Sequence, residues 1–104
     1  MLRTVIYGSR PDGQAKVVAE LAAAQGGFEL IGLLDDFPEN RGRRIGELEV
    51  IGTGADLDRL RRAGAEALLI GYGESVGRSE LASRALEAGL ELPNLVHPTS
   101  VRYD

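Results

Sequence analysis

The sequence predicts an α/β fold, in which helices flank a small and mostly parallel β-sheet. Short apolar runs rich in β-branched residues alternate with longer stretches whose apolar residues recur at helical spacing. The second of these runs is apolar on both of its alternating faces, as in a strand that is covered on both sides. No repeat or linker interrupts the alternation, so the 104 residues fit a single domain.

The first half of the chain has three regular segments. Residues 4–7 form an apolar, β-branched run before a glycine, which predicts a strand. Residues 14–25 are rich in Ala, carry apolar residues on one face and stop at two glycines, which predicts a helix. Residues 28–34 are mostly apolar and predict a second strand.

The second half follows the same pattern after a polar loop predicted at 37–46, where a proline and several turn residues occur. Residues 48–51 predict a short strand. Residues 54–63 predict a helix, because acidic residues in its first turn and arginines near its end complement the helix dipole. The remaining elements are a buried strand, a third helix and a last extended run, at 67–71, 75–88 and 92–96.

The composition argues against several classes of protein. The chain has no cysteine and one histidine, so it can form no disulfide or thiolate metal site, and a zinc site is not expected. His97 has no partner for a catalytic triad and is expected to be structural. The net charge of −4 argues against nucleic-acid binding through a basic surface. No apolar run approaches the roughly 18 residues that span a bilayer, so a cytoplasmic protein that binds no membrane is expected.

Ligands of parallel sheets bind beyond the carboxyl ends of the strands, which makes the loops at 8–16, 35–46 and 71–78 the candidates, together with the residues after Val96. The first loop is a glycine-rich turn from a strand into a helix, where free N–H groups and the helix dipole favour phosphate. It also contains the only lysine of the chain, and a compact ammonium suits such a site. The candidate phosphate-binding residues are Gly8, Ser9, Gly13, Gln14 and Lys16. Because the third glycine of G-x-G-x-x-G is missing, an ordinary turn is an alternative.

Two acidic residues, Asp35 and Asp36, follow the second predicted strand. Asp35 comes 22 residues after Gly13, close to the ~20 residues that precede the ribose-binding acid in dinucleotide folds. Both are candidates for binding the ribose or base of a nucleotide, with a solvated turn as the alternative. A second glycine-rich turn from a strand into a helix, which includes Gly73, Glu74 and Ser75, is expected at the same end of the sheet, with an ordinary tight turn as the alternative. Three arginines of the intervening loop are expected to be solvated, namely Arg41, Arg43 and Arg44.

Five motifs occur in order along nearly the whole chain. They are V-I-Y-G with G-Q-A-K-V-V at 5–8 and 13–18, I-G-L-L-D-D-F-P at 31–38, G-E-L-E-V-I-G at 46–52, G-E-S with Arg78 at 73–78, and L-V-H-P-T-S-V at 95–101. Together they resemble the N-terminal domain of the sialic-acid O-acetyltransferase and bacillosamine-type N-acetyltransferase family, which are bacterial hexapeptide-repeat sugar acyltransferases.

The resemblance implies a Rossmann-like three-layer domain that holds the nucleotide of a UDP-sugar during glycan or polysaccharide biosynthesis. The glycine loop would face the phosphates, Asp35 and Asp36 would lie near the uridine, and the turn at Gly73 would line the same cleft. In the family, acyl transfer from acetyl-CoA takes place on a C-terminal left-handed β-helix of hexapeptide repeats. That second domain supplies the general-base histidine and the trimer contacts.

The sequence departs from the family pattern in two places. No hexapeptide repeat is present, so 1–97 is expected to be the nucleotide-sugar-binding domain and 98–104 to begin the linker to an absent β-helix. The chain is then expected to have no catalytic residue, metal or cofactor of its own and to be inactive by itself. Acetyl-CoA binding and any homo-oligomer are assigned to the β-helix. The glycine loop is also two residues longer than in the family, and Gln14 replaces a usual histidine.

Two other functions stay open. One is a small NAD(P)- or CoA-binding Rossmann domain of a sensor or enzyme, which the incomplete glycine motif and the lack of a substrate domain disfavour. The other is a ligand-free interaction domain, in which the glycine loops are only turns. Binding experiments distinguish the three functions. A preference for UDP indicates the nucleotide-sugar-binding domain, a preference for NAD or CoA indicates the sensor or enzyme domain, and failure to bind any nucleotide indicates the interaction domain.

Overall fold

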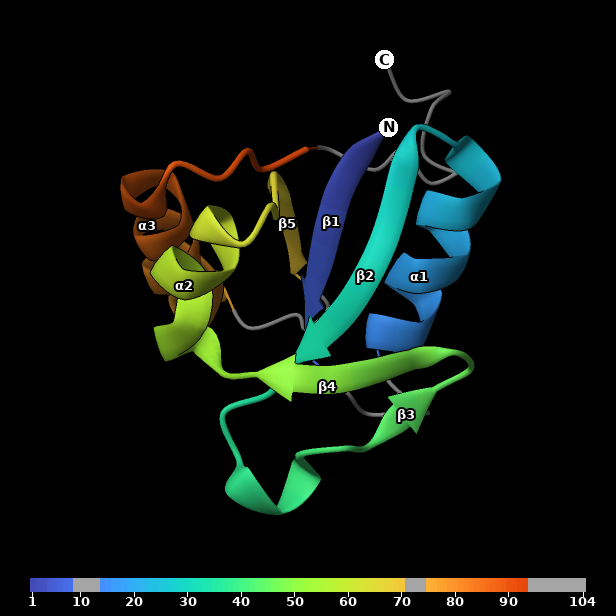
Figure 1. Ribbon diagram of the computed structural model, residues 1–104, viewed down its shortest axis with the longest axis horizontal. Coiled ribbons are helices and arrows are strands. Elements are labelled where there is room, and N and C mark those ends of the chain that lie inside the picture. Colours follow the sequence, from blue (N-terminus) through green and yellow to red (C-terminus); the bar gives the residue numbers. More distant parts are fainter. Residues whose placement is uncertain (9–13, 71–74, 94–104) are drawn as a thin grey trace.

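The computed structural model describes residues 1–8, 14–70 and 75–93, and these form a sheet between two layers of helices (Figure 1). The strands are β1 (Leu2–Tyr7), β2 (Phe28–Leu34), β3 (Arg44–Ile45), β4 (Leu48–Gly52) and β5 (Ala67–Ile70). The helices are α1 (Gln14–Gln25), α2 (Leu57–Arg62) and α3 (Ser75–Ala88), with 3-10 turns η1 (Pro38–Asn40) and η2 (Gly54–Asp56). The predicted Rossmann-like α/β fold is confirmed.

The strand order in the sheet is β3-β4-β2-β1-β5. Strands β4, β2, β1 and β5 run parallel, and β3 runs antiparallel to β4 at one side. Tyr7 pairs with Leu34 and Ile70, and Leu34 pairs with Gly52. The four parallel strands therefore end side by side, and these four residues mark the carboxyl edge of the sheet.

The sheet has a separate hydrophobic core on each face, because neighbouring residues of a strand point to opposite sides. Val5, Leu34 and Leu68 belong to the core that also contains Leu57 and Leu60 of α2 and Leu81 and Ala85 of α3. Ile6, Leu33 and Leu69 belong to the core that contains Ala15 and Ala22 of α1. Helix α1 thus covers one face, while α2 and α3 cover the other (Figure 1). This double cover explains why the buried ends of β1 and β2, and all of β5, are apolar on both faces.

Some elements differ from the prediction. The segment expected to be a polar loop contains η1 and the two-residue strand β3, whose Arg44 pairs with Glu49 across a turn at Gly46. Gly46 has a φ of 60°, a conformation that glycine adopts without the strain a side chain would cause. The predicted helix 54–63 is the turn η2 followed by α2. Of the last extended run, predicted at 92–96, only residues 92 and 93 are described, and they belong to no strand. Just before them, Glu91 forms a parallel bridge with Ala67.

In the part of the chain that the structure describes, no helix is long and apolar enough to cross a membrane.

Candidate functional site

Three loops leave the carboxyl edge from fixed starting points. Gly8 follows β1, and its N–H donates to the carbonyl of Leu34 at 2.7 Å. Asp35 follows β2, and its N–H donates to the carbonyl of Gly52 at 3.0 Å. The sheet hydrogen bonding therefore extends one residue beyond each strand, so the loops after β1, β2 and β4 begin next to one another.

Asp35 is a buried carboxylate that closes the turn following β2. The residue is 8% exposed. One oxygen, Oδ1, accepts the N–H of Phe37 at 2.9 Å, and Oδ2 accepts the amide of Asn40 at 3.1 Å. These bonds connect the carboxylate to η1, so Asp35 stabilises the conformation of its own loop.

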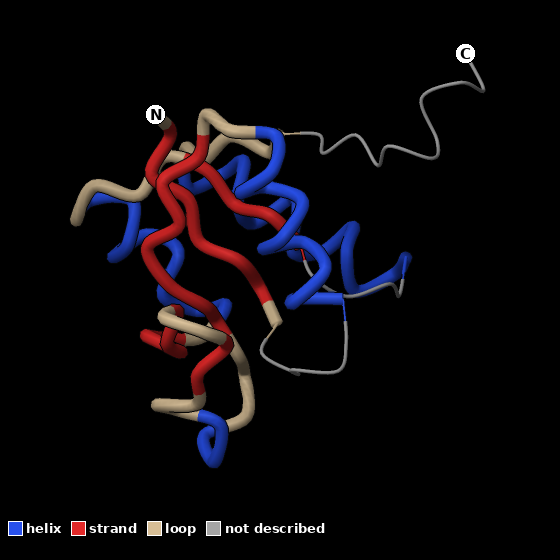
Figure 2. The backbone as a smooth tube through the Cα atoms, turned by 90° about the vertical axis from the view of Figure 1, so that its right-hand side faces the viewer, coloured by secondary structure: helices blue, strands red, loops and turns tan. Residues whose placement is uncertain are grey.

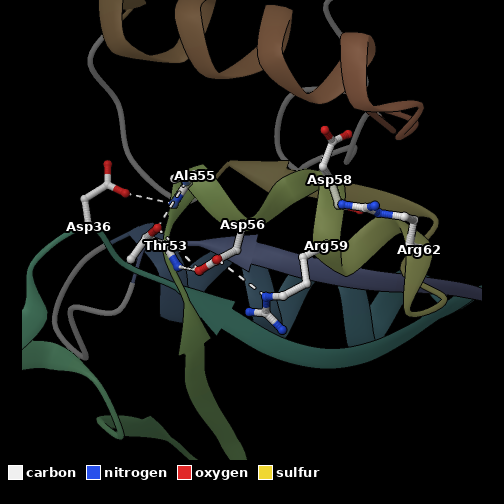
Figure 3. Close-up of polar contacts among 8 residues, drawn as sticks. Asp36, Thr53, Ala55, Asp56, Asp58, Arg59 and Arg62 are labelled. Carbon is white, nitrogen blue, oxygen red and sulfur yellow. Dashed lines mark hydrogen bonds and ion pairs between the residues drawn. The ribbon is translucent and has the colours of Figure 1, made fainter.

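Asp36 is exposed and links the ends of three strands. Its Oδ1 accepts the N–H of Gly54 at 2.8 Å, and its Oδ2 accepts the hydroxyl of Tyr7. Figure 3 shows its side chain pointing from β2 to the turn after β4. A carboxylate has about four acceptor positions, so these two bonds leave capacity for a hydroxyl of a ligand.

Gly54 allows this contact because it has no side chain. A Cβ at this position would lie 3.2 Å from Oδ1 of Asp36 and 3.2 Å from Cε2 of Tyr7. Neither Gly54 nor Tyr7 is among the candidates that sequence reasoning selected. The available signal was the Gly-Thr-Gly stretch at 52–54, which follows a predicted strand as the three candidate loops do.

A capping box fixes the turn that contains Gly54. The N–H of Thr53 donates to Oδ2 of Asp56 at 2.7 Å, and Oγ1 of Thr53 accepts the N–H of Ala55 at 3.1 Å (Figure 3). The Thr53 N–H holds the pKa of Asp56 below its ordinary value of 3.8, and Arg59, whose Nε lies 3.5 Å from Oδ1, adds to this. Partial burial opposes the shift without cancelling it.

The lowered pKa makes this turn sensitive to acid. Since the folded pKa of Asp56 lies below the unfolded one, its stabilisation is present above about pH 4 and is lost as the pH falls through the folded pKa. We expect Asp56→Asn to cost about 1 kcal/mol of unfolding free energy at pH 7, as for a lost cap, and less at pH 2.5. Urea unfolding at both pH values measures this.

The matched control is Asp58→Asn, an exposed acid in the first turn of α2 whose carboxylate has no hydrogen bond to a described residue. An identical pH dependence for both variants would mean that the helix dipole, and not the capping box, is responsible.

The N-terminus of α1 carries the partial positive charge of the helix dipole, which favours an anionic ligand. The first turn of the helix has no acidic residue. Lys16 lies in that turn, is exposed, and makes no ion pair with any residue in the described ranges. Ala15 beside it is buried in the core, which fixes this part of the helix against the sheet.

Other candidates are only partly described. Ser9, Gly13, Gly73 and Glu74 lie outside the described residues, and Gln14 and Ser75 are described only as the first residues of α1 and α3. Arg44 pairs with Glu49 at 3.1 Å, while Arg41 and Arg43 are exposed, consistent with a solvated loop. Among the described residues, no group of His, Cys, Asp and Glu could hold a metal ion.

An open hollow of about 310 Å³ lies between η2, α2 and α3. Gly54 and Asp58 line one side of it, and Arg84 lines the other. The hollow thus borders the residue that Asp36 contacts, on the face of the sheet that α2 and α3 cover.

Comparison with known proteins finds a sequence family and several related structures. The sequence profile of the PglD N-terminal domain matches residues 4–85. A variant of perosamine N-acetyltransferase from Caulobacter crescentus, in complex with CoA and GDP-perosamine, is 30% identical with a TM-score of 0.77. The acetyltransferase domain of PglB from Neisseria gonorrhoeae FA1090, in complex with acetyl coenzyme A, is 33% identical with a TM-score of 0.73.

The two matches include most of this chain but less than half of each related chain. They cover 91% and 92% of this chain, which spans 42% of the perosamine N-acetyltransferase chain and 44% of the PglB acetyltransferase domain. A Rex-family repressor, RSP, is 20% identical with a TM-score of 0.72 and shares the fold alone. A search of curated proteins found no match.

Proposed function

The chain belongs to the PglD N-terminal domain family, and on this basis we propose that it binds the nucleotide part of a nucleotide-sugar at the carboxyl edge of its sheet. The observation that carries the proposal is that Asp36 joins Tyr7 and Gly54 at this edge, and that Lys16 in the first turn of α1 makes no ion pair with a described residue. The related perosamine N-acetyltransferase variant is in complex with GDP-perosamine, which supports a nucleotide-sugar as the class of ligand.

The proposed contacts follow the charges of the site. Backbone N–H groups at the start of α1, with Lys16, bind the diphosphate, because a helix N-terminus and an ammonium both attract anions. Gly8 has no side chain and so lets the phosphates approach the end of β1. Ser9, Gly13 and Gln14 complete this loop in the proposal. Asp36 accepts a hydroxyl of the ribose or a donor of the base, and Asp35 assists by shaping the turn. Gly73, Glu74 and Ser75 line the same cleft.

The activity of a complete protein is also a proposal. The chain is proposed to present the sugar to an acetyltransferase domain that binds acetyl-CoA, as an acetyl coenzyme A complex is known for the PglB relative. In this proposal 1–97 is the binding unit and 98–104 leads to the other domain, through which the protein would oligomerise in the cytoplasm.

Calorimetric titration of the chain with UDP and with GDP tests the binding role, with NAD as the control ligand. We expect both diphosphates to bind and Lys16→Ala to weaken them by about 1–3 kcal/mol, the usual worth of a charge-assisted contact. Arg62→Ala is the matched control, because it removes one exposed positive charge from the last turn of α2.

Two outcomes would contradict the proposal. The absence of heat with either diphosphate at millimolar concentration would exclude a nucleotide site in this chain. Equal, small losses for Lys16→Ala and Arg62→Ala would reduce the role of Lys16 to general electrostatic attraction. Tighter binding of NAD would instead favour a dinucleotide domain.

A further inference from the structure

An exposed aromatic residue precedes η1 at the carboxyl edge. Phe37 is 63% exposed. It is one of two phenylalanines in the chain. The other, Phe28, packs against the core beside α1. Both views show η1 at the opposite end of the molecule from the N-terminus, beyond the ends of the parallel strands (Figures 1 and 2).

The backbone of Phe37 is held on both sides. Its N–H donates to Oδ1 of Asp35 at 2.9 Å, and its carbonyl accepts the N–H of Asn40 at 2.9 Å. Asp35 is itself bonded to the carbonyl of Gly52. The exposed aromatic ring is therefore carried by a fixed backbone.

Neither the turn nor the packing requires an aromatic side chain here. The φ and ψ of Phe37 are −86° and 119°, an extended conformation that any residue adopts. A single exposed apolar residue is common on protein surfaces. Phe37 differs because it directly follows Asp36, whose carboxylate reaches into the proposed nucleotide site.

A nucleobase suits such a ring. Aromatic side chains stack on the flat face of any base, because every base has a π-face and the contact removes apolar surface from water. We propose that Phe37 stacks on the nucleobase of the bound nucleotide and so makes the site prefer nucleotides to phosphorylated compounds without a base. This proposal rests on the proposed function.

A fluorescence experiment tests the contact directly. The chain contains no tryptophan, so Phe37→Trp introduces a single reporter at the proposed contact. Titration with GDP and with UDP is expected to quench its emission and to saturate at the concentrations at which heat is released. Leu86→Trp is the matched control, since Leu86 is 61% exposed on α3, and its emission is expected to stay constant.

Affinities provide the second measurement. Phe37→Ala is expected to weaken GDP and UDP by about 5- to 150-fold, the range for one base–aromatic stack. Phe37→Tyr is expected to retain binding, whereas Phe37→Leu, which is apolar but has no ring, is not. The thermal unfolding midpoint of each variant is expected to match wild type, because the ring is exposed.

The outcomes separate this proposal from the one it rests on. If the nucleotides bind and Lys16→Ala weakens them, while Phe37→Ala has no effect and Phe37→Trp is silent, stacking is wrong and the proposed function stands. If neither nucleotide binds wild type, both proposals are wrong.

Discussion

Leu34→Ala is expected to lower the free energy of unfolding by about 2–5 kcal/mol, the range for truncating a buried leucine. Leu34 is fully buried at the end of β2 and belongs to the core that contains α2 and α3. The alanine variant loses apolar contact and leaves a cavity that the packed layers close only in part. Since a domain is typically stable by about 5–15 kcal/mol, this one change removes a large share.

Urea unfolding followed by circular dichroism measures the loss from the midpoint, provided that the slope with denaturant is unchanged. Leu86→Ala is the matched control, because that leucine is 61% exposed and its truncation is expected to change stability by about 0.5 kcal/mol or less. A similar small loss for both variants would show that α2 and α3 do not pack on β2 as described.

Asp35→Asn is expected to cost about 1–3 kcal/mol of unfolding free energy, although it changes only one atom. Both carboxylate oxygens accept hydrogen bonds, from the N–H of Phe37 and from the amide of Asn40. An asparagine places an NH₂ group opposite one of these donors, whichever way it is turned. At a site that is 8% exposed, water cannot easily make up for the lost bond.

Asp36→Asn is the matched comparison on the next residue. Its amide oxygen can still accept from Gly54, and the hydroxyl of Tyr7 can accept from the new NH₂ group. We expect a change of about 0.5 kcal/mol or less in stability, together with weaker binding of UDP and GDP in the titration above. Equal stability losses for the two variants would contradict the separate roles given to these neighbours.

Much of the fold could be predicted because its main elements carry strong local patterns. The runs that became β1, β2, β4 and β5 are apolar and rich in β-branched or leucine residues, and α1 and α3 have the predicted bounds. Strand β3 could not be predicted in this way. Two residues form no pattern, and the strand exists because Arg44 and Ile45 pair with Glu49 and Leu48 across a turn.

The position of the candidate site could be predicted, but the division of roles within it could not. The rule that ligands bind at the carboxyl ends of parallel strands was enough to select Asp35 and Asp36. Which of them turns back onto its own loop depends on the side of β2 from which each side chain leaves. The partners of Asp36 are Tyr7 and Gly54, which are 29 and 18 residues away, and no local pattern encodes contacts of that separation.

The central place of β1 has a consequence for biosynthesis. Strand β1 is made before its neighbour β5, which lies much later in the chain. The hydrogen bond between Arg3 and Glu66, for example, joins residues that are 63 positions apart. At ribosomal rates of about 5–20 residues per second, β1 waits about 3–13 seconds for that neighbour. During this time an apolar strand has one unpaired edge, the kind of surface that aggregates or recruits chaperones. The nascent chain therefore keeps this edge of β1 unpaired until β5 has left the ribosome.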